Sequence, residues 1–279
     1  MKGARVPSVQ TGMSYAVLVG LAIVVLFPFY WMTVTSFKNE EQMRSLISMF
    51  WPKPLVGENY EQLLSRTDFV KWYGNSATVA ISSTLIATAV GTIGAYALAR
   101  LRFLGRGFMA SATLITYLVP PSILFIPLYA QMRNLGLANS LGGLIAAYPS
   151  FTVPFVTWLL MGYFESIPEE LEEAAMIDGA TRFGAFYRVV LPLSAPGVLA
   201  AGLYAFTQAW NEFLYALVFI TDGKLRTLPV GLASFITGDV YGWGYLMAGA
   251  VLTTLPVIAA YIYLQKYMVE GLTAGSVKG

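Results

Sequence analysis

The chain has 279 residues, of which 57% are hydrophobic and only 11% are charged, whereas about 25% of a typical soluble domain is charged. The mean hydropathy of +0.63 excludes an ordinary soluble enzyme, and the net charge of +2 gives no reason to expect a nucleic-acid partner. The sequence contains neither cysteine nor histidine, which removes disulfides, thiolate and imidazole metal sites, and Ser-His triads. Composition therefore predicts an integral membrane protein with few groups suited to catalysis.

Long segments without a charged residue predict the membrane spans. A helix needs about 20 mostly apolar residues to cross the hydrocarbon core of a bilayer. We expect an all-α membrane protein with six transmembrane helices in a single transmembrane domain, residues 1–279. The expected helices are at 13–36, 75–99, 107–131, 141–163, 195–220 and 245–266. The first helix is too long for a cleaved signal peptide, and Pro120 and Pro121 predict a break in the third.

An even number of spans places both termini on the same side of the membrane. Arg100, Arg102 and Arg106 crowd the short connector between the second and third helices, and short cytoplasmic connectors are rich in Lys and Arg. This density favours cytoplasmic termini, although the total numbers of Lys and Arg on the two sides are nearly equal.

The connector at 165–194 predicts a helix–turn–helix outside the membrane. A capping box that begins at Ser166 would start the first helix, and Gly179 would end it with a positive φ. Thr181 would cap a second helix, which Pro192 and Pro196 would stop before the fifth span. Composition alone favours a solvated surface hairpin here.

The spacing inside this connector favours a more specific interpretation. Glu173-Ala174-Ala175 is followed after three residues by Gly179, and after nine more by Val189-Val190-Leu191-Pro192. This pattern resembles the E-A-A-x3-G-x9-I-x-L-P signature of permeases in ATP-binding-cassette (ABC) importers, with Val189 where Ile is usual.

The resemblance extends over nearly the whole chain. The segments 35–38, 210–213 and 271–279 are also similar to inner-membrane permeases for sugars, above all to the second permease subunit of maltose-type systems. The resemblance implies that the connector is cytoplasmic and docks as a coupling element on an ATP-hydrolysing subunit. The residues expected at this contact are Glu172, Glu173, Ala174, Ala175, Gly179, Leu191 and Pro192.

The C-terminal tail is a second candidate contact with the ATPase in this family, through Gly271, Thr273 and Lys278. A frayed polar terminus is an equal alternative for these residues.

The connector at 165–194 suits the role of a coupling element. Such an element must transmit movement as a rigid body, and two capped short helices joined at a glycine are stiff.

The energy source is expected outside this chain. No P-loop pattern is present, so no cofactor is expected here, and ATP and Mg²⁺ would be bound by a separate ATPase dimer. The resemblance also implies a sister permease subunit and an extracytoplasmic sugar-binding protein, all assembled at the lipid bilayer of a bacterial or archaeal cytoplasmic (inner) membrane. The connectors at 38–71 and 222–244 would meet that receptor, or would be passive loops.

One carboxylate, Glu212, lies inside a predicted span, where an ionisable group costs about 3 kcal/mol and normally faces a cavity or a partner. Helical spacing predicts one polar stripe on the fifth span that would line the path of a sugar. The members of this stripe are Tyr204, Gln208, Asn211, Glu212 and Tyr215. The alternative is that Glu212 is a structural clasp to the sister subunit, to Asn75 or to Arg133.

The sequence thus favours a non-enzymatic permease subunit of an ABC importer that carries a sugar of di- or oligosaccharide size. A permease for another solute, such as glycerol phosphate or a peptide, is the nearest alternative, but a phosphate would require cationic residues along the path. A secondary transporter would need several buried carboxylates or histidines. A membrane enzyme would need a polar constellation that the connector acids do not form.

Overall fold

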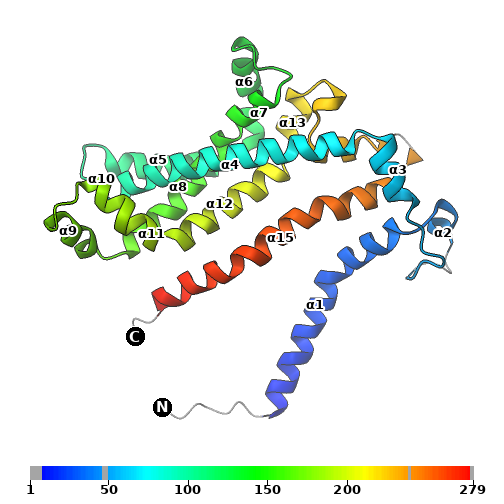
Figure 1. Cartoon of the computed structure of the whole chain (residues 1–279), viewed down its shortest axis with the longest axis horizontal. Helices are drawn as coiled ribbons and strands as arrows, with labels where there is room; N and C mark the ends of the chain where they lie inside the picture. The colour runs from blue at the N-terminus through cyan, green and yellow to red at the C-terminus, as the bar shows by residue number, and fades with distance from the viewer. Residues whose placement is uncertain (1–7, 46–49, 238–239, 277–279) are drawn as a thin grey trace. The chain divides into compact units, whose positions relative to one another are not determined.

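The computed structural model describes residues 8–45, 50–237 and 240–276, shown as a ribbon in Figure 1. The chain separates into two compact units, one made of Met1–Phe69 and Leu232–Leu255 and the other of Val70–Gly231 and Pro256–Gly279.

The first unit contains one long helix, the start of a second one, and the short elements next to them in the chain. Its elements are α1 (Ser8–Ser36), α2 (Glu40–Arg44), α3 (Glu58–Arg66), β1 (Ile236–Thr237), β2 (Val240–Tyr241) and the start of α15 (Trp243–Ser276). Asn39 and Gln42 form a reciprocal capping box that starts α2, with N···O distances of 2.8 and 3.0 Å. The strands pair antiparallel, with Ile236 opposite Tyr241. This small strand pair is the one departure, within the described residues, from the expected all-α fold.

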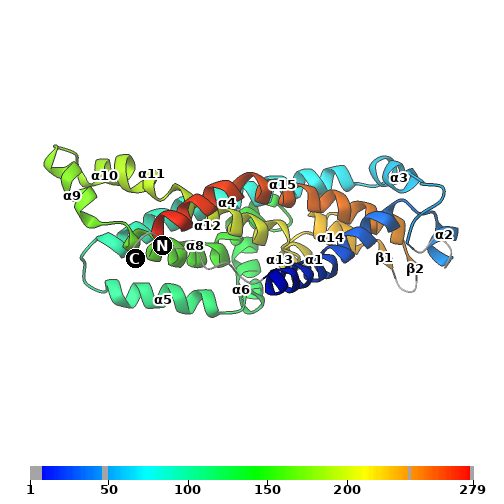
Figure 2. The ribbon, with the colours of Figure 1, turned by 90° about the horizontal axis from the view of Figure 1, so that it is seen from below.

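The second unit is a layered set of helices. In chain order its elements are α4 (Phe69–Arg100), α5 (Arg106–Leu118), α6 (Pro121–Asn134), α7 (Leu141–Ala147), α8 (Pro149–Ser166), α9 (Glu169–Ile177), α10 (Arg182–Ala185), a π-helix (Phe186–Val190), α11 (Leu191–Leu193), α12 (Ala195–Trp210), α13 (Leu214–Phe219), a 3-10 turn (Gly223–Leu225) and α14 (Leu228–Ala233). In both views, α9 and α10 extend beyond the ends of α8 and α12 (Figures 1 and 2).

Small residues allow α4, α8 and α12 to approach closely. Ala87 and Ala95 of α4 and Ala201 and Ala205 of α12 are fully buried around α8. A Cβ on Gly91 would lie 2.5 Å from a methyl group of Val156, so only glycine fits at that crossing. Membrane helices associate through such close packing because lipid offers no hydrophobic drive between them.

The candidate spans agree with an all-helical membrane protein. Four segments are long and apolar enough to cross a membrane: Gly12–Ser36, Phe69–Arg100, Leu141–Ser166 and Trp243–Tyr267. Two bent pairs satisfy the same criterion together, α5 with α6 at 98° and Arg182–Leu193 with α12 at 75°. The described residues therefore contain four candidate spans, or six if each bent pair counts as one.

Two of the expected helices are not continuous. The third ends at Leu118 and restarts at Pro121, so the break expected at Pro120 and Pro121 is confirmed. The fifth, expected at 195–220, ends at Trp210 and resumes at Leu214 as α13. The expectation of one helix there was wrong, and the reason lies in the contacts of Glu212 described below.

Candidate functional site

The connector between α8 and α12 folds as the expected helical hairpin. After α9, Gly179 adopts a φ of +93°, and the N–H of Ala180 donates to the carbonyl oxygen of Ala175 at 3.0 Å. Thr181 then caps α10, its Oγ1 accepting from the N–H of Gly184 at 3.1 Å. Both the left-handed glycine and the threonine cap are confirmed.

One detail of the hairpin differs from expectation. Ser166 does not cap α9, because α8 continues to Ser166 and its Oγ donates to the carbonyl oxygen of Tyr163 at 2.6 Å. Pro168 precedes α9 without a side-chain cap. The second helix passes through the π-helical turn at Phe186–Val190 and ends at Leu193, where the chain bends by 75° into α12. The stop expected at Pro192 and Pro196 is therefore confirmed.

The outer surface of the hairpin combines acids with exposed apolar side chains. Glu173, Ala174 and Gly179 are exposed, as is Pro192, and Ala175 and Leu191 are half-buried. Ile177 is 86% exposed, Phe183 74% and Tyr187 63%. Reasoning from the sequence missed these three apolar residues, because their exposure depends on which face the folded hairpin presents.

Glu172 faces inward, in contrast to the expectation that it joins the outer contact. It is 4% exposed. Its carboxylate accepts a hydrogen bond from the hydroxyl of Tyr96, and its Oε2 lies 3.6 Å from Nε of Arg100. Glu172 therefore belongs to the root of the hairpin, where α9 meets the end of α4.

The predicted polar stripe is divided by the break after α12. Gln208 and Asn211 are exposed, and Tyr204 is half-buried with its hydroxyl accepting from Nε2 of Gln208 at 3.1 Å. Tyr215, in contrast, is buried, and its hydroxyl donates to the carbonyl oxygen of Pro121 at 2.9 Å. The stripe is thus not one helical face, since Tyr215 turns into the protein.

Glu212 lies in the break and caps the helix that follows. Its carboxylate accepts from the backbone N–H of Tyr215 at 2.8 Å and of Ala216 at 3.0 Å. It also accepts from the hydroxyl of Tyr148 at 2.8 Å.

The partners proposed for Glu212 within the chain were wrong. Tyr148 takes the place of Asn75 and Arg133, and the amide of Asn75 donates instead to the carbonyl oxygens of Lys224 and Arg226.

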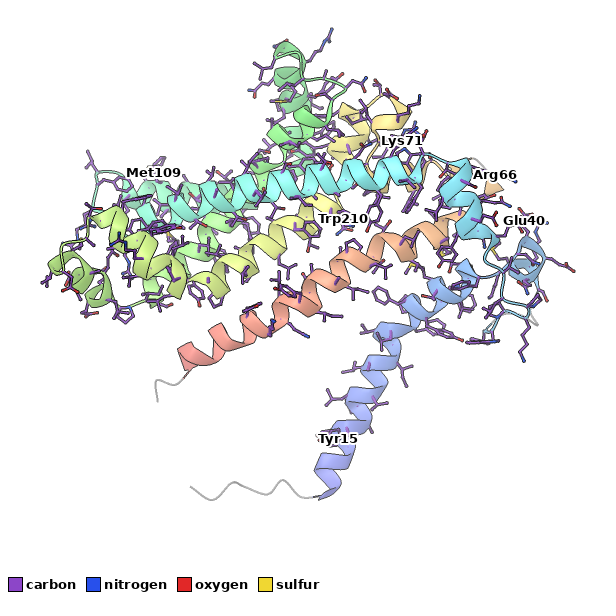
Figure 3. The ribbon with its side chains drawn as sticks, viewed as in Figure 1. Tyr15, Glu40, Arg66, Lys71, Met109 and Trp210 are labelled. Atoms are coloured by element: carbon purple, nitrogen blue, oxygen red, sulfur yellow. The ribbon has the colours of Figure 1, made fainter. Side chains whose placement is uncertain are left out.

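Aromatic rings from two other helices gather beside Tyr204. The centroid of Phe155 lies 3.7 Å from that of Tyr204 and 5.1 Å from that of Tyr117. Trp158 follows at 6.1 Å from Phe155. Reasoning from the sequence missed this group because its members come from α5, α8 and α12. Trp210, labelled in Figure 3, instead packs edge-on against Tyr73 of α4, with the ring centroids 5.5 Å apart.

In the first unit, the two connectors expected to meet a receptor line one cavity of about 570 Å³. Its lining comes from Asn39, Glu40, Met43, Arg44, Glu58, Asn59, Gln62, Gly242, Trp243, Gly244 and Tyr245. Figure 3 shows Glu40 on α2 with its side chain pointing outward.

The expected contact of the C-terminal tail lies partly outside the described residues. The backbone of Gly271 and Thr273 belongs to α15, whereas the side chain of Thr273 and the whole of Lys278 are not described.

Comparisons with known proteins agree on one family. Residues 87–273 match the model described as "Binding-protein-dependent transport system inner membrane component". The trehalose/maltose transport system permease protein MalG of Thermococcus litoralis is 38% identical over 268 residues, which cover 93% of this chain and 94% of the relative. The sulfoquinovosyl glycerol transport system permease protein SmoH of Agrobacterium fabrum is 40% identical over 254 residues, covering 91% and 89%.

A solved structure shares the fold. It is the crystal structure of a bacterial ABC transporter involved in the import of the acidic polysaccharide alginate, with a TM-score of 0.77 and 24% identity. The similarity covers 96% of this chain and 99% of that one.

Proposed function

Because the chain belongs to the inner membrane components of binding-protein-dependent transport systems, we propose that it forms half of the translocation pathway of an ABC importer for a di- or oligosaccharide. Relatives that match over most of their length are named for trehalose and maltose, diacetylchitobiose and arabinooligosaccharides. The subunit is not an enzyme, and ATP is bound and hydrolysed by a separate subunit.

The observation that carries the proposal is the surface of the hairpin. Ile177, Phe183, Tyr187 and the acid Glu173 are all exposed on this hairpin, which extends beyond the ends of α8 and α12 (Figure 2). Exposed apolar groups surrounded by polar ones mark a surface that binds another protein. We assign this surface to the ATPase dimer, with Glu173, Ala174, Ala175, Gly179, Leu191 and Pro192 at or near the contact.

The sugar path is proposed to run past Tyr204, Gln208 and Asn211. Both amides are exposed, Gln208 on α12 and Asn211 directly after its end, and such a position suits a water-filled path better than lipid. The ring of Phe155 beside Tyr204 supplies a flat apolar surface for the C–H face of a sugar. Glu212 acts on this path indirectly, because its hydrogen bonds to the N–H groups of Tyr215 and Ala216 stabilise the break that ends α12.

The remaining partners follow from the same arrangement. If the hairpin is cytoplasmic, both termini are cytoplasmic in a six-span topology, and the tail at 271–279 lies on the side of the ATPase. The cavity between the connectors of the first unit then lies on the outer side, where the sugar-binding protein would dock. The sister permease would complete the path.

The proposal is tested with the purified complex of this chain, its sister permease and its ATPase, reconstituted in lipid vesicles with the binding protein outside. We expect ATP-dependent uptake of a labelled di- or oligosaccharide from a panel that includes maltose, trehalose and chitobiose. We also expect no uptake by the isolated chain. Uptake without the ATPase, or uptake driven by an ion gradient, would overturn the proposal and favour a secondary transporter. Uptake of glycerol phosphate in preference to sugars would overturn the substrate assignment.

A further inference from the structure

We propose that Arg100 is a positioning residue that locks the hairpin to the membrane helices, so that movement imposed on the hairpin also moves α4 and α8. The inference rests on the proposed contact between hairpin and ATPase, and it concerns the opposite, buried side of the hairpin.

The side chain of Arg100 joins three elements at one point. Arg100 is the last residue of α4, yet its side chain is only 4% exposed. One of its terminal nitrogens donates to the carbonyl oxygens of Phe164, at 2.9 Å, and of Ile167, at the C-terminal end of α8. The other terminal nitrogen lies 3.3 Å from the carboxylate of Glu169, and Nε lies 3.6 Å from that of Glu172, both in the first turn of α9.

Tyr96, one turn earlier on α4, completes the cluster. Its hydroxyl donates to Glu172, and its ring centroid lies 4.4 Å from that of Phe186 in the second arm of the hairpin. The root of the hairpin is therefore attached to α4 in two ways, by an aromatic contact and by an ionic cluster in which Arg100 and Glu172 are buried and Glu169 is 61% exposed. The aromatic contact does not need Arg100, so the hairpin can stay folded when the ionic cluster is weakened.

The geometry suits an arginine and no other cation. The planar guanidinium carries five donors in a fixed arrangement and reaches several acceptors at once, whereas a lysine ammonium is a point charge on a flexible stem. The two carbonyl oxygens that accept from Arg100 lie at the C-terminal end of α8, which is the negative end of the helix dipole. Because a buried ion pair adds little net stability over an apolar replacement, directional locking is a better reason than stability for the presence of Arg100 here.

Locking matters because a coupling element must move as a rigid body. A hairpin held only by its two chain connections could tilt on the ends of α8 and α12. A hairpin that is also attached to α4 moves three helices together, because α4 packs into the same core as α8 and α12. A second ion pair at this end joins Arg106 to Glu165 with an N···O distance of 3.9 Å. Both of its side chains are partly exposed, so it contributes little.

The test uses the complete complex in vesicles and measures sugar transported per ATP hydrolysed. Arg100→Lys keeps the charge but loses the multidentate geometry, and Arg106→Lys is the matched control at the exposed pair. For Arg100→Lys we expect ATPase recruitment and basal hydrolysis close to wild type, while sugar moved per ATP falls by about tenfold, within the usual range of coupling between two sites. Tyr96→Phe, which removes one hydroxyl, is expected to lower the ratio by a smaller factor, and Arg106→Lys is expected to leave it unchanged.

Three results would overturn the inference. An unchanged transport-to-ATP ratio in Arg100→Lys would show that the cluster transmits nothing. Loss of assembly and hydrolysis in proportion to uptake would give Arg100 a folding role alone. An equal loss of ratio in Arg106→Lys would mean that any ion pair at this end matters. Failure of the proposed function is distinguishable from all three, because the wild-type chain would then recruit no ATPase.

Discussion

Replacing Glu212 with leucine separates a structural clasp from a group whose only role is to line the path. The carboxylate accepts three hydrogen bonds, from the N–H groups of Tyr215 and Ala216 and from the hydroxyl of Tyr148. Tyr148 is completely buried, so its hydroxyl has little access to water. Leucine is of similar size and offers no acceptor to any of the three donors.

The cost can be estimated from these contacts. A buried donor left without an acceptor costs about 1–3 kcal/mol, so three such donors cost about 3–9 kcal/mol. Removal of a carboxylate from a membrane span returns about 3 kcal/mol. The expected net loss is therefore about 3 kcal/mol at the centre of the range, a shift of about a hundredfold in the folding equilibrium. Glu212→Gln keeps an acceptor oxygen and should lose about 1 kcal/mol.

The assay heats the detergent-solubilised complex and measures the fraction that remains monodisperse by size-exclusion chromatography. We expect Glu212→Leu to lose the monodisperse form at a clearly lower temperature than wild type and Glu212→Gln to stay close to it. Asn211→Leu is the matched control, since the exposed amide of Asn211 donates to the backbone carbonyl oxygen of Thr207, one turn earlier in the chain, at 2.8 Å. If Glu212→Leu has the thermal stability of the wild type, Glu212 is not a structural clasp. If this variant also transports sugar at the wild-type rate, Glu212 has no role at the path either.

Three further predictions concern two glycines and the cavity of the first unit. Gly179→Ala meets no atom within 4 Å, but its φ of +93° costs an L residue about 1–2 kcal/mol. The affinity of the complex for the ATPase, measured in a titration, should therefore fall by about 5–30-fold. Gly162→Ala is the control, because that position is equally open but helical, and this variant should bind the ATPase with wild-type affinity. Equal affinities of the two variants for the ATPase would contradict the prediction. Gly197→Ala would place a Cβ 2.7 Å from the ring of Tyr163 and should destabilise by about 1–3 kcal/mol, measured as a lower melting temperature. The added substitution Tyr163→Ala should recover part of the loss, and no recovery would show that this contact is not the cause. Trp243→Ala, at the cavity of the first unit, should reduce ATP hydrolysis stimulated by the binding protein while basal hydrolysis stays constant; unchanged stimulation would place the docking surface elsewhere.

Features that depend on local chemistry could be predicted from the sequence. Charge-free segments indicated the membrane helices because burial of charge in lipid is costly wherever the segment packs. The turn at Gly179, the cap at Thr181 and the break at Pro120 and Pro121 are confirmed for the same reason, since each depends on the backbone preference of one or two residues.

Features that depend on distant contacts could not be predicted. The sequence Asn211-Glu212-Phe213 contains no glycine or proline that would signal a break. Glu212 caps the helix that follows the break, and its third partner, Tyr148, lies 64 positions away. Arg100 was interpreted as one of several cations in a short connector, but its acceptors lie on α8 and α9. Glu172 could not be separated from the exposed Glu173 next to it, because the direction of each side chain is set by how α9 packs on α4.

The central claim is that the exposed face of the hairpin is held by a separate ATPase, and site-specific photo-crosslinking in intact cells tests it most directly. A photoreactive residue at Ile177, which is 86% exposed on the hairpin, is compared with one at Leu135, 68% exposed after α6. The account predicts an adduct between the permease and the ATPase at Ile177 and none at Leu135. If the photoreactive residue at position 177 forms adducts with lipid or an extracytoplasmic protein, and never with the ATPase, the central claim is contradicted.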